Sequence, residues 1–430
     1  MSDERFDVII VGGGISGTVA GYLLAKEGLD VMLVERGNYS GSKNMTGGRI
    51  YSHSLERIIP NFALEAPVER KITREKISLM TEESNVTLDF SSTRLGEQGS
   101  DSYSVLRGVF DQWLASKAED AGVQMVAGIR VDDLIVREGK VCGIVAGEDE
   151  IEADVTILAD GVNSLLAQKL GYRGELAPHQ VAVGVKEIIE LPSEVIDDRF
   201  NCRNGEGTSW LFAGTPSAGK VGGGFLYTNK TSISLGVVST LSELIKADKT
   251  LPQMLEDFKN HPSIGPLLKD GKMIEYSGHL VPEGGLHMVP KIIGDGVLIV
   301  GDAAGFCINL GYAVRGMDFA VGSAECAAKA ILKAKEAQNF SAEFLQCYQS
   351  FLDESFVMKD LKHYRNFPHF LEETPRIFDE YPGMAADIMV DLFVVTGNPP
   401  QPMMKMMMKH VKKIGLLNIA KDGWKGVRSL

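Results

Sequence analysis

The sequence predicts a protein of the α/β class. We expect a buried parallel sheet, a mostly antiparallel α+β insertion and a helical C-terminal region. Two observations predict the parallel sheet, because apolar runs pass through glycine-rich turns into helical patterns at residues 7–28 and again at 296–320. A third predicts the insertion. Between about 176 and 290, runs such as VAVGVKEIIEL and SISLGVVST are rich in β-branched residues and are separated by Gly, Pro and Asn turns.

The composition of the chain narrows the classes of protein to which it can belong. With 430 residues, 44% hydrophobic and 23% charged, the chain is typical of a globular protein with two or three domains. A net charge of −13 argues against nucleic-acid binding. No apolar run reaches the roughly 18 residues of a spanning helix, and MSDERFDVII lacks a basic signal region. We therefore expect a cytoplasmic protein whose membrane contact, if any, is peripheral on the inner face of the cell membrane.

The five cysteines predict no metal site of their own. Cys142, Cys202, Cys307, Cys326 and Cys347 are widely spread, and no two have CxxC spacing. Zinc knuckles and self-contained iron–sulfur clusters normally need that spacing. We expect reduced, mostly buried thiols, and no nucleophile–His–Asp arrangement or metal-ligand spacing marks a catalytic residue.

The first nucleotide signal is DVIIVGGGISG, residues 7–17. Gly12, Gly14 and Gly17 have GxGxxG spacing between an apolar strand and a helix, with Ile15 and Ser16 in the same turn. This arrangement is typical of a Rossmann-type dinucleotide site, where the helix N-terminus meets the pyrophosphate. Glu35 ends the next strand, where it can bind ribose hydroxyls and disfavour a 2′-phosphate. The motif does not choose between NAD and FAD, and a plain glycine turn is the alternative.

The segment after Glu35 favours a longer ligand. RGNYSGSKNMTGGRIYSHSLE, residues 36–56, is polar, glycine-rich and too long for a routine turn. We expect it to lie over an extended cofactor, with Lys43 and Asn44, beside Gly47 and Gly48, facing a ring system. A solvated loop is the alternative.

Residues 102–164 are expected to return the chain to the nucleotide sheet. SYSVLRGVFDQWLASKAEDAG, residues 102–122, predicts a helix with an apolar stripe of Leu106, Val109, Phe110, Trp113 and Leu114. Arg107, near its start, either meets cofactor phosphate or ribose or is exposed to solvent. Residues 123–164 then predict a strand, a β-meander and a return strand ending at Asp160-Gly161.

The second nucleotide signal lies about 290 residues after the first. GVLIVGDAAG predicts another buried parallel strand with Asp302 at its carboxyl end, where ligands bind in open α/β sheets. Asp302 can accept hydrogen bonds from ribityl hydroxyls. Gly311 to Gly316 are expected to open a helix that stabilises negative charge on a flavin ring. Two remote segments serving one long ligand indicate FAD.

These motifs resemble one family. DVIIVGGGISG, SKNMTGGRIYSHSLE, LADGVNS, GGGFLYTNKTSISLGVV and GDAAGFCINLGYAVRGMDFA look like the FixC family, and the resemblance extends to the C-terminal KKIGLLNIAKDGWKGVRSL. FixC proteins are flavoprotein dehydrogenases related to electron-transfer-flavoprotein:quinone oxidoreductase, and more distantly to geranylgeranyl reductases and aromatic-ring hydroxylases. The resemblance implies non-covalent FAD, electrons arriving from electron transfer flavoprotein subunits and leaving toward quinone, and a separate ferredoxin-like iron–sulfur partner in a FixABCX-type complex. The longer quinone oxidoreductases carry C-terminal cluster ligands that this chain lacks.

The expected organisation has three parts. A discontinuous FAD-binding domain spans 1–75, 103–175 and 291–340, a substrate or quinone domain spans 76–102 and 176–290, and a helical region spans 341–430. Within 76–92 we expect a β-hairpin. From Met403 onward the tail has seven Lys or Arg and one acid, with five methionines in 403–408. It suits a partner surface or an anionic membrane, or else a helix packing its Met face on the core.

The expected cofactor-binding residues are Gly12, Gly14, Ile15, Ser16, Gly17, Glu35, Arg36, Lys43, Asn44, Gly47, Gly48, Arg107, Val131, Asp160, Gly161, Gly301, Asp302, Gly311 and Ala313.

Two other functions remain open at this stage. One is a reductase or monooxygenase of a hydrophobic substrate, which would be reduced by NAD(P)H. The other is a non-catalytic, flavin-loaded scaffold subunit. A second GxGxxG after a strand is lacking, which mildly disfavours a dedicated nicotinamide domain.

Overall fold

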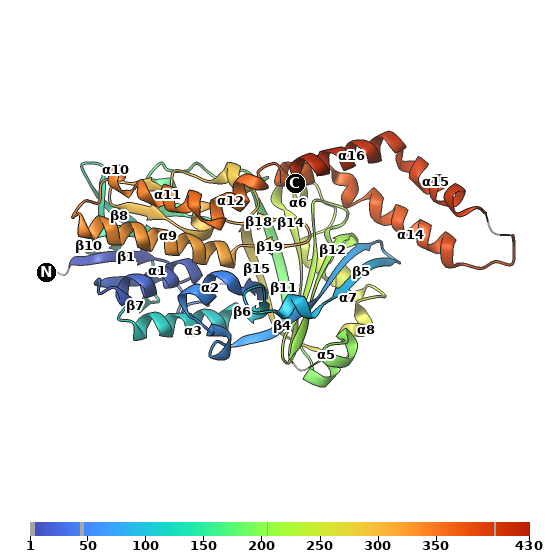
Figure 1. Cartoon of the computed structure of the whole chain (residues 1–430), viewed down its shortest axis with the longest axis horizontal. Helices are drawn as coiled ribbons and strands as arrows, with labels where there is room; N and C mark the ends of the chain where they lie inside the picture. Colours follow the sequence, from blue (N-terminus) through green and yellow to red (C-terminus); the bar gives the residue numbers. More distant parts are fainter. Residues whose placement is uncertain (1–4, 44–46, 204, 400) are drawn as a thin grey trace.

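The computed structural model describes residues 5–43, 47–203, 205–399 and 401–430. Two sheets lie next to each other, and helices of the C-terminal region cover one side and extend beyond the second sheet (Figure 1). The fold confirms the α/β class and its antiparallel insertion.

The first sheet is the expected parallel sheet, in the order β16-β17-β10-β1-β2-β7. Its strands are β1 (Arg5–Val11), β2 (Val31–Glu35), β7 (Gln124–Ala127), β10 (Asp149–Leu158), β16 (Ile293–Gly294) and β17 (Val297–Ile299). β1 pairs in parallel with β2 and β10, and β10 with β17. The remote strand at 297–299 thus enters the same sheet as the N-terminal strand, and the carboxyl ends of both strands meet at one edge.

Helices and a meander cover this sheet. Helix α1 (Ile15–Lys26) packs against α3 (Arg107–Asp120) and α9 (Met317–Glu336). β8 (Asp133–Arg137) and β9 (Lys140–Ala146) form the predicted meander with β10. The strands β1 and β10 carry apolar side chains that are fully buried, as expected for a sheet covered on both faces.

The second sheet has nine strands, in the order β15-β11-β14-β13-β12-β4-β6-β3, with β5 paired to β4. They are β3 (Gly47–Tyr51), β4 (Val68–Met80), β5 (Asn85–Ser91), β6 (Ser102–Leu106), β11 (Val181–Glu190), β12 (Glu206–Gly214), β13 (Gly222–Thr228), β14 (Ser232–Thr240) and β15 (Lys272–Pro282). All its strand pairs are antiparallel except β12 with β4. The hairpin predicted within 76–92 is β4–β5. Because β3, β6 and the start of β4 belong to this sheet, the sheet crosses the boundaries expected near residues 75 and 103.

Three local expectations are corrected. The helix expected over 102–122 begins at Arg107, because Ser102–Leu106 pair with β3 and β4. Val109, placed on its apolar stripe, is 53% exposed. The connection expected over 36–56 ends at Gly47, where β3 begins and leads into α2 (Ser52–Ile58). The helix expected from 311 begins at Met317, after a small hairpin of β18 (Ile308–Asn309) and β19 (Val314–Arg315).

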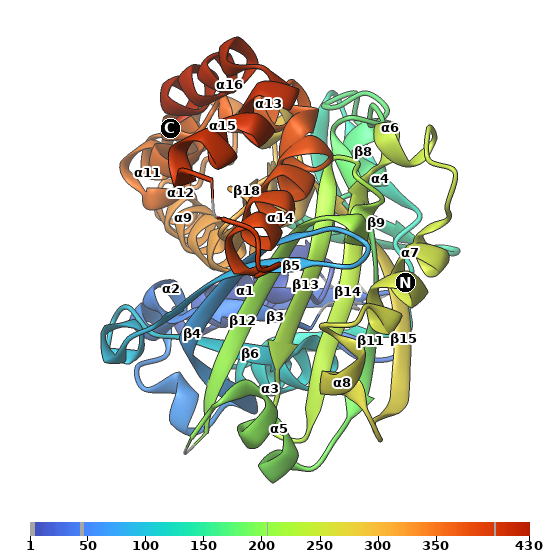
Figure 2. The same cartoon turned by 90° about the vertical axis from the view of Figure 1, so that its right-hand side faces the viewer.

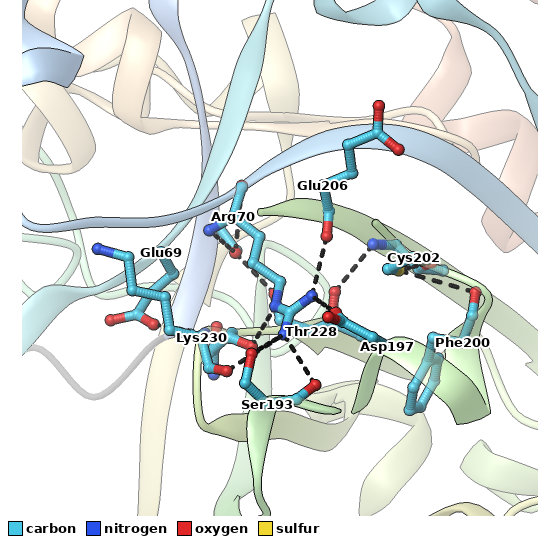
Figure 3. Close-up of polar contacts among 12 residues, drawn as sticks. Glu69, Arg70, Ser193, Asp197, Phe200, Cys202, Glu206, Thr228 and Lys230 are labelled. Carbon is cyan, nitrogen blue, oxygen red and sulfur yellow. Dashed lines mark hydrogen bonds and ion pairs between the residues drawn. The ribbon is translucent and has the colours of Figure 1, made fainter. Parts of the chain in front are cut away.

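Arg70 on β4 holds one end of the second sheet together (Figure 3). It is 1% exposed, yet its guanidinium pairs with Asp197 of α5 (Ser193–Phe200). Its Nε donates to the Asn229 carbonyl at 2.6 Å, and its Nη2 donates to Ser193 Oγ at 2.9 Å. A buried guanidinium is tolerated when its donors are met in this way. Arg70 therefore connects β4, α5 and the turn between β13 and β14.

The remaining helices lie around the second sheet and in the C-terminal region. Helix α4 (Leu165–Lys169) instead packs against β8 of the first sheet. Around the second sheet lie α6 (Leu241–Leu244), α7 (Leu251–Asn260) and α8 (Gly265–Leu268). In the C-terminal region lie α10 (Ala342–Leu345), α11 (Cys347–Glu354), α12 (Phe356–His363), α13 (Phe367–Glu372), α14 (Glu380–Phe393), α15 (Met403–Ile414) and α16 (Leu416–Ser429). Helices α13 to α16 gather beside one end of the second sheet (Figure 2). In the described part of the chain, no helix has the length and apolarity that crossing a membrane requires.

Candidate functional site

A cavity of about 890 Å³ lies between the two sheets. It runs from the glycine turn at the end of β1, past the inner face of the second sheet, to α13. Its lining thus comes from all three parts of the chain.

The glycine turn is built for close backbone approach. Gly12 has a φ of +109°, and a Cβ there would lie 2.3 Å from the Ala159 carbonyl oxygen. A Cβ on Gly17 would lie 2.0 Å from the Gly12 carbonyl oxygen. Gly14 caps α1 with its first-turn N–H groups at the cavity. Only glycine fits at 12 and 17, and the free N–H groups suit an anion such as a pyrophosphate.

Glu35 sits beside this turn. Its Oε2 accepts from the Gly13 N–H at 2.8 Å and its Oε1 accepts from the Gly37 N–H at 2.6 Å. The Ser40 and Ser42 hydroxyls are buried here without a hydrogen-bond partner among the described residues. These two hydroxyls are not part of the cavity lining, whereas Glu35 is, and a carboxylate there can accept hydrogen bonds from the hydroxyls of a sugar.

Arg107 and Asp302 face the cavity from opposite segments. Arg107 begins α3 and forms a two-pronged ion pair with Asp111, with both N–O distances at 2.7 Å. Asp302 lies in the turn directly after β17, and burial raises the pKa of its carboxyl while the Arg107 charge opposes the rise. Burial also raises the pKa of Asp160 at the end of β10, although the Ser164 hydroxyl donates to it at 2.9 Å. Arg107, Asp160 and Asp302 all line the cavity at the carboxyl edge of the sheet.

A basic wall of the cavity was not predicted. Lys186 of β11 is buried, and burial lowers its pKa to about 8 despite Glu275 at 3.5 Å. His279 of β15 lies nearby, where burial and then the charges of Arg107 and Arg36 lower its pKa. Both line the cavity. The signal that could have found Lys186 is a charged residue inside the apolar run VAVGVKEIIEL.

The far end of the cavity is apolar. Val281, Leu310, Phe367, Leu371 and Phe378 contribute to its wall. Within it, Glu283 and Asn309 supply polar atoms. This composition, mostly apolar with few polar groups, is typical of a site for an organic ligand.

Most of the predicted residues come together. The cavity lining includes Gly12, Gly14, Ile15, Ser16, Glu35, Arg36, Lys43, Gly48, Arg107, Val131, Asp160, Gly161, Asp302 and Gly311. Gly17, Gly301 and Ala313 are not part of the described lining, and Gly47 begins β3. Gly301 instead allows close packing, since a Cβ there would lie 2.5 Å from Ser16 Oγ. Asn44 lies outside the described residues.

The described residues fit FAD. The glycine turn and Glu35 suit the adenosine diphosphate portion. Asp302 and Arg107 lie farther along the same cavity, where a ribityl chain would run.

The described residues contain no cluster of three or more His, Cys, Asp or Glu that could hold a metal, and the five cysteines are unpaired thiols. Cys202 and Cys326 are buried, whereas Cys142, Cys307 and Cys347 are half-buried.

Two family models match the chain. Residues 7–168 match the FAD dependent oxidoreductase model, and residues 367–430 match the ETF-QO/FixC family C-terminal domain. The second match begins at α13, which forms the apolar wall of the cavity.

Curated relatives match over the whole length. A probable electron transfer flavoprotein-quinone oxidoreductase, YdiS, of Escherichia coli K12 is 56% identical over 100% of both chains. Protein FixC of Salmonella typhi is 53% identical over 100% of both.

Solved structures share the fold at low identity. A geranylgeranyl bacteriochlorophyll reductase-like protein of Thermoplasma acidophilum superposes with a TM-score of 0.73 at 21% identity, covering 98% of this chain and 99% of the other. The myxobacterial FAD-dependent halogenase CndH gives a TM-score of 0.64 at 18% identity, covering 97% of each chain.

The cavity, the FAD-dependent oxidoreductase match and the full-length relatives lead to one conclusion: the chain is an FAD-dependent oxidoreductase and belongs to the ETF-QO/FixC family of flavoproteins.

Proposed function

We propose that the protein takes electrons from an electron transfer flavoprotein and delivers them, through FAD, to a quinone. The observation that carries this proposal is the apolar end of the cavity. Its wall comes from Phe367, Leu371 and Phe378, in the region that matches the ETF-QO/FixC C-terminal domain. A quinone is an uncharged ring with an apolar tail, so it suits an apolar recess that opens off the FAD site. The name of the relative YdiS, a probable electron transfer flavoprotein-quinone oxidoreductase, supports the same donor and acceptor.

The chain's own residues hold and tune the cofactor. The α1 N-terminus and Arg107 would bind the phosphate and ribityl region, and Glu35 the adenosine ribose. Bound FAD supplies the electron-carrying chemistry. Lys186 has a pKa of about 8, so at neutral pH its positive charge would favour an anionic reduced ring. The lowered pKa of His279 beside it favours a neutral imidazole. The second sheet and α13 supply apolar side chains to the far end of the cavity.

The proposed assembly has further members. Besides the electron transfer flavoprotein subunits, we include a ferredoxin-like iron–sulfur protein, as in a FixABCX-type complex. The five cysteines are dispersed, and the described residues contain no cluster-ligand group. A cluster in this electron path would therefore come from a partner.

Peripheral contact with the inner face of the cell membrane is part of the proposal. Helix α14 packs against β4 and β5, and the α14–α15 pair continues beyond the second sheet (Figure 1). Near their far end Phe393 is 78%, Val395 93% and Met404 69% exposed. Lys405 lies beside them and has no ion-pair partner among the described residues. Exposed apolar side chains next to lysines suit the interface of an anionic membrane.

Anaerobic double-mixing stopped-flow tests the electron path. The FAD-loaded protein is mixed first with reduced electron transfer flavoprotein and then with a short-chain quinone. The proposal predicts bleaching of the flavin absorbance in the first step and its recovery in the second. Reduction by NAD(P)H but not by electron transfer flavoprotein would instead indicate a reductase or monooxygenase, and no reduction by either would indicate a scaffold subunit.

A further inference from the structure

Glu283 stands out among the cavity residues that the electron path does not use. It follows β15, lines the cavity, and is half-buried. Asn309 Nδ2 donates to its two carboxylate oxygens at 3.3 and 3.4 Å. Among the described residues Glu283 has no ion-pair partner, so its negative form is held only by this amide. A carboxyl in such surroundings favours its neutral, proton-carrying form.

The loop that carries Glu283 lies between the two functional ends of the cavity. A Cβ on Gly285 would lie 3.0 Å from Pro368 Cγ of α13. A Cβ on Gly305, in the turn that follows Asp302, would lie 2.8 Å from Met288 Cγ of the same loop. The segment from 283 to 288 therefore packs against the predicted ribityl-binding turn on one side and the apolar wall on the other.

The titratable groups that face Glu283 add no positive charge. Glu372 of α13 lines the same cavity and is exposed, and its charge raises the pKa of Glu283. Cys307 also lines the cavity, and burial together with the charges of Asp302 and Glu283 holds the pKa of its thiol well above the usual value. Burial first, and the Glu372 charge in addition, raise the pKa of Glu283 to about 7. The group therefore exchanges a proton near neutral pH, which a proton-transfer group requires.

We infer that Glu283 donates a proton to the acceptor reduced in the apolar end of the cavity, and that Glu372 connects it to solvent. This role rests on the proposed quinone reduction. A quinone becomes a quinol by taking two electrons and two protons. Bound FAD, once reduced, would supply both electrons and one of the protons. For the second proton, the carboxyl O–H bond of Glu283 breaks and an O–H bond forms on a quinone oxygen. The carboxylate then recovers a proton from solvent through Glu372.

The test compares Glu283→Gln, Glu283→Asp and Glu372→Gln with Glu190→Gln, an exposed carboxylate at the end of β11. Each variant is first checked for bound FAD. Infrared difference spectroscopy then follows the protonated carboxyl band with pH. A band that titrates near pH 7 in the wild type is expected to vanish in Glu283→Gln. In Glu372→Gln it should titrate at lower pH, because a charge that raises the pKa of Glu283 is gone. Glu190→Gln should behave as the wild type.

Stopped-flow measurement of flavin oxidation and reduction rates provides a second test. At pH 7, we expect the rate of flavin oxidation by quinone, divided by the rate of flavin reduction in the same variant, to fall at least tenfold in Glu283→Gln compared with the wild type. Glu283→Asp should recover part of this rate. Absence of a titrating carboxyl between pH 6 and 8 in the wild type, or unchanged quinone-dependent oxidation in Glu283→Gln, would overturn the role of Glu283 and leave the electron path standing. If quinone fails to oxidise the wild-type flavin, the proposed function is overturned, and this role with it.

Discussion

At the scale of single residues, the cofactor site depends on two glycines that nothing larger can replace. We predict that Gly17→Ala weakens FAD binding at least tenfold, about 1.4 kcal/mol, because the new Cβ would lie 2.0 Å from the Gly12 carbonyl oxygen. Fluorescence titration of the apoprotein with FAD measures the loss. Gly383→Ala is the matched control, since its Cβ meets nothing within 4 Å. Equal FAD affinity in the two variants would contradict the role of the turn.

Removing Arg70 would leave its buried hydrogen-bond acceptors without a donor, which costs folding free energy. We predict that Arg70→Met destabilises the protein by about 3–5 kcal/mol, because Asp197 and several carbonyls lose a buried donor. Arg74→Met on the same strand removes an exposed pair with Asp89 and should cost at most about 1 kcal/mol. Urea unfolding followed by circular dichroism measures both. Similar losses in the two variants would show that burial of Arg70 is not the deciding factor.

Residue identities could be predicted where the backbone dictates them. Gly12, Gly14, Glu35 and Asp302 follow from motifs whose spacing is set by a strand, a turn and a helix. Lys186 and Glu283 could not be predicted in this way. Lys186 lies on β11 and Glu283 follows β15, and these strands line the cavity because of a strand order that is not local in sequence. Side chains selected by long-range pairing leave little trace in a local pattern.

At the scale of elements, the pair α14–α15 carries the surface proposed to meet the membrane. His410 of α15 lies between Asp387 and Asp391 of α14, at 3.1 and 2.6 Å. Lys413 pairs with Asp387 and Lys409 with Asp391, so part of the basic tail is neutralised within the fold. The exposed apolar end remains for contact outside the molecule.

We predict that Phe393→Ser with Val395→Ser weakens binding to anionic vesicles roughly tenfold, about 1.4 kcal/mol, because two of the most exposed apolar side chains are lost. Vesicle co-sedimentation measures it, with FAD content as the check on folding. Leu64→Ser with Ile245→Ser is the control, because these residues are 86% and 71% exposed elsewhere. A loss that is as large in the control would argue against a specific membrane surface.

Element types were predicted well where apolar periodicity was strong, as in β1, α1, β10 and β14. The misassignment of 102–106 has a simple reason. SYSVL can continue a helical stripe into α3, but its backbone pairs with β3 and β4 instead, which buries Ser102, Ser104 and Val105. Long-range pairing overrode the local pattern. The start of α9 was displaced by a local hairpin, because 308–309 pair with 314–315.

At the scale of the whole molecule, the cavity is lined by several carboxyl groups whose pKa is raised by burial. Glu283 has a folded-state pKa of about 7 against an ordinary value of 4.5. The folded state therefore binds more protons than the unfolded state between these values, and the free energy of unfolding falls as pH rises through that window.

We accordingly predict that the melting temperature of Glu283→Gln minus that of the wild type is larger at pH 8 than at pH 4.5, because the variant side chain cannot ionise. Differential scanning calorimetry of the apoprotein at the two pH values measures the change. A difference between variant and wild type that is the same at both pH values would contradict the raised pKa.

The central claim is that one continuous cavity holds FAD and its electron acceptor together. A crystal structure of the FAD-loaded protein soaked with a short-chain quinone tests it most directly. We expect the FAD phosphates at Gly12–Gly17, the ribityl chain near Asp302, and the quinone ring beside Glu283 with its tail toward Phe367 and Phe378. Quinone bound in a pocket separated from FAD, or only on the outer surface, would contradict it.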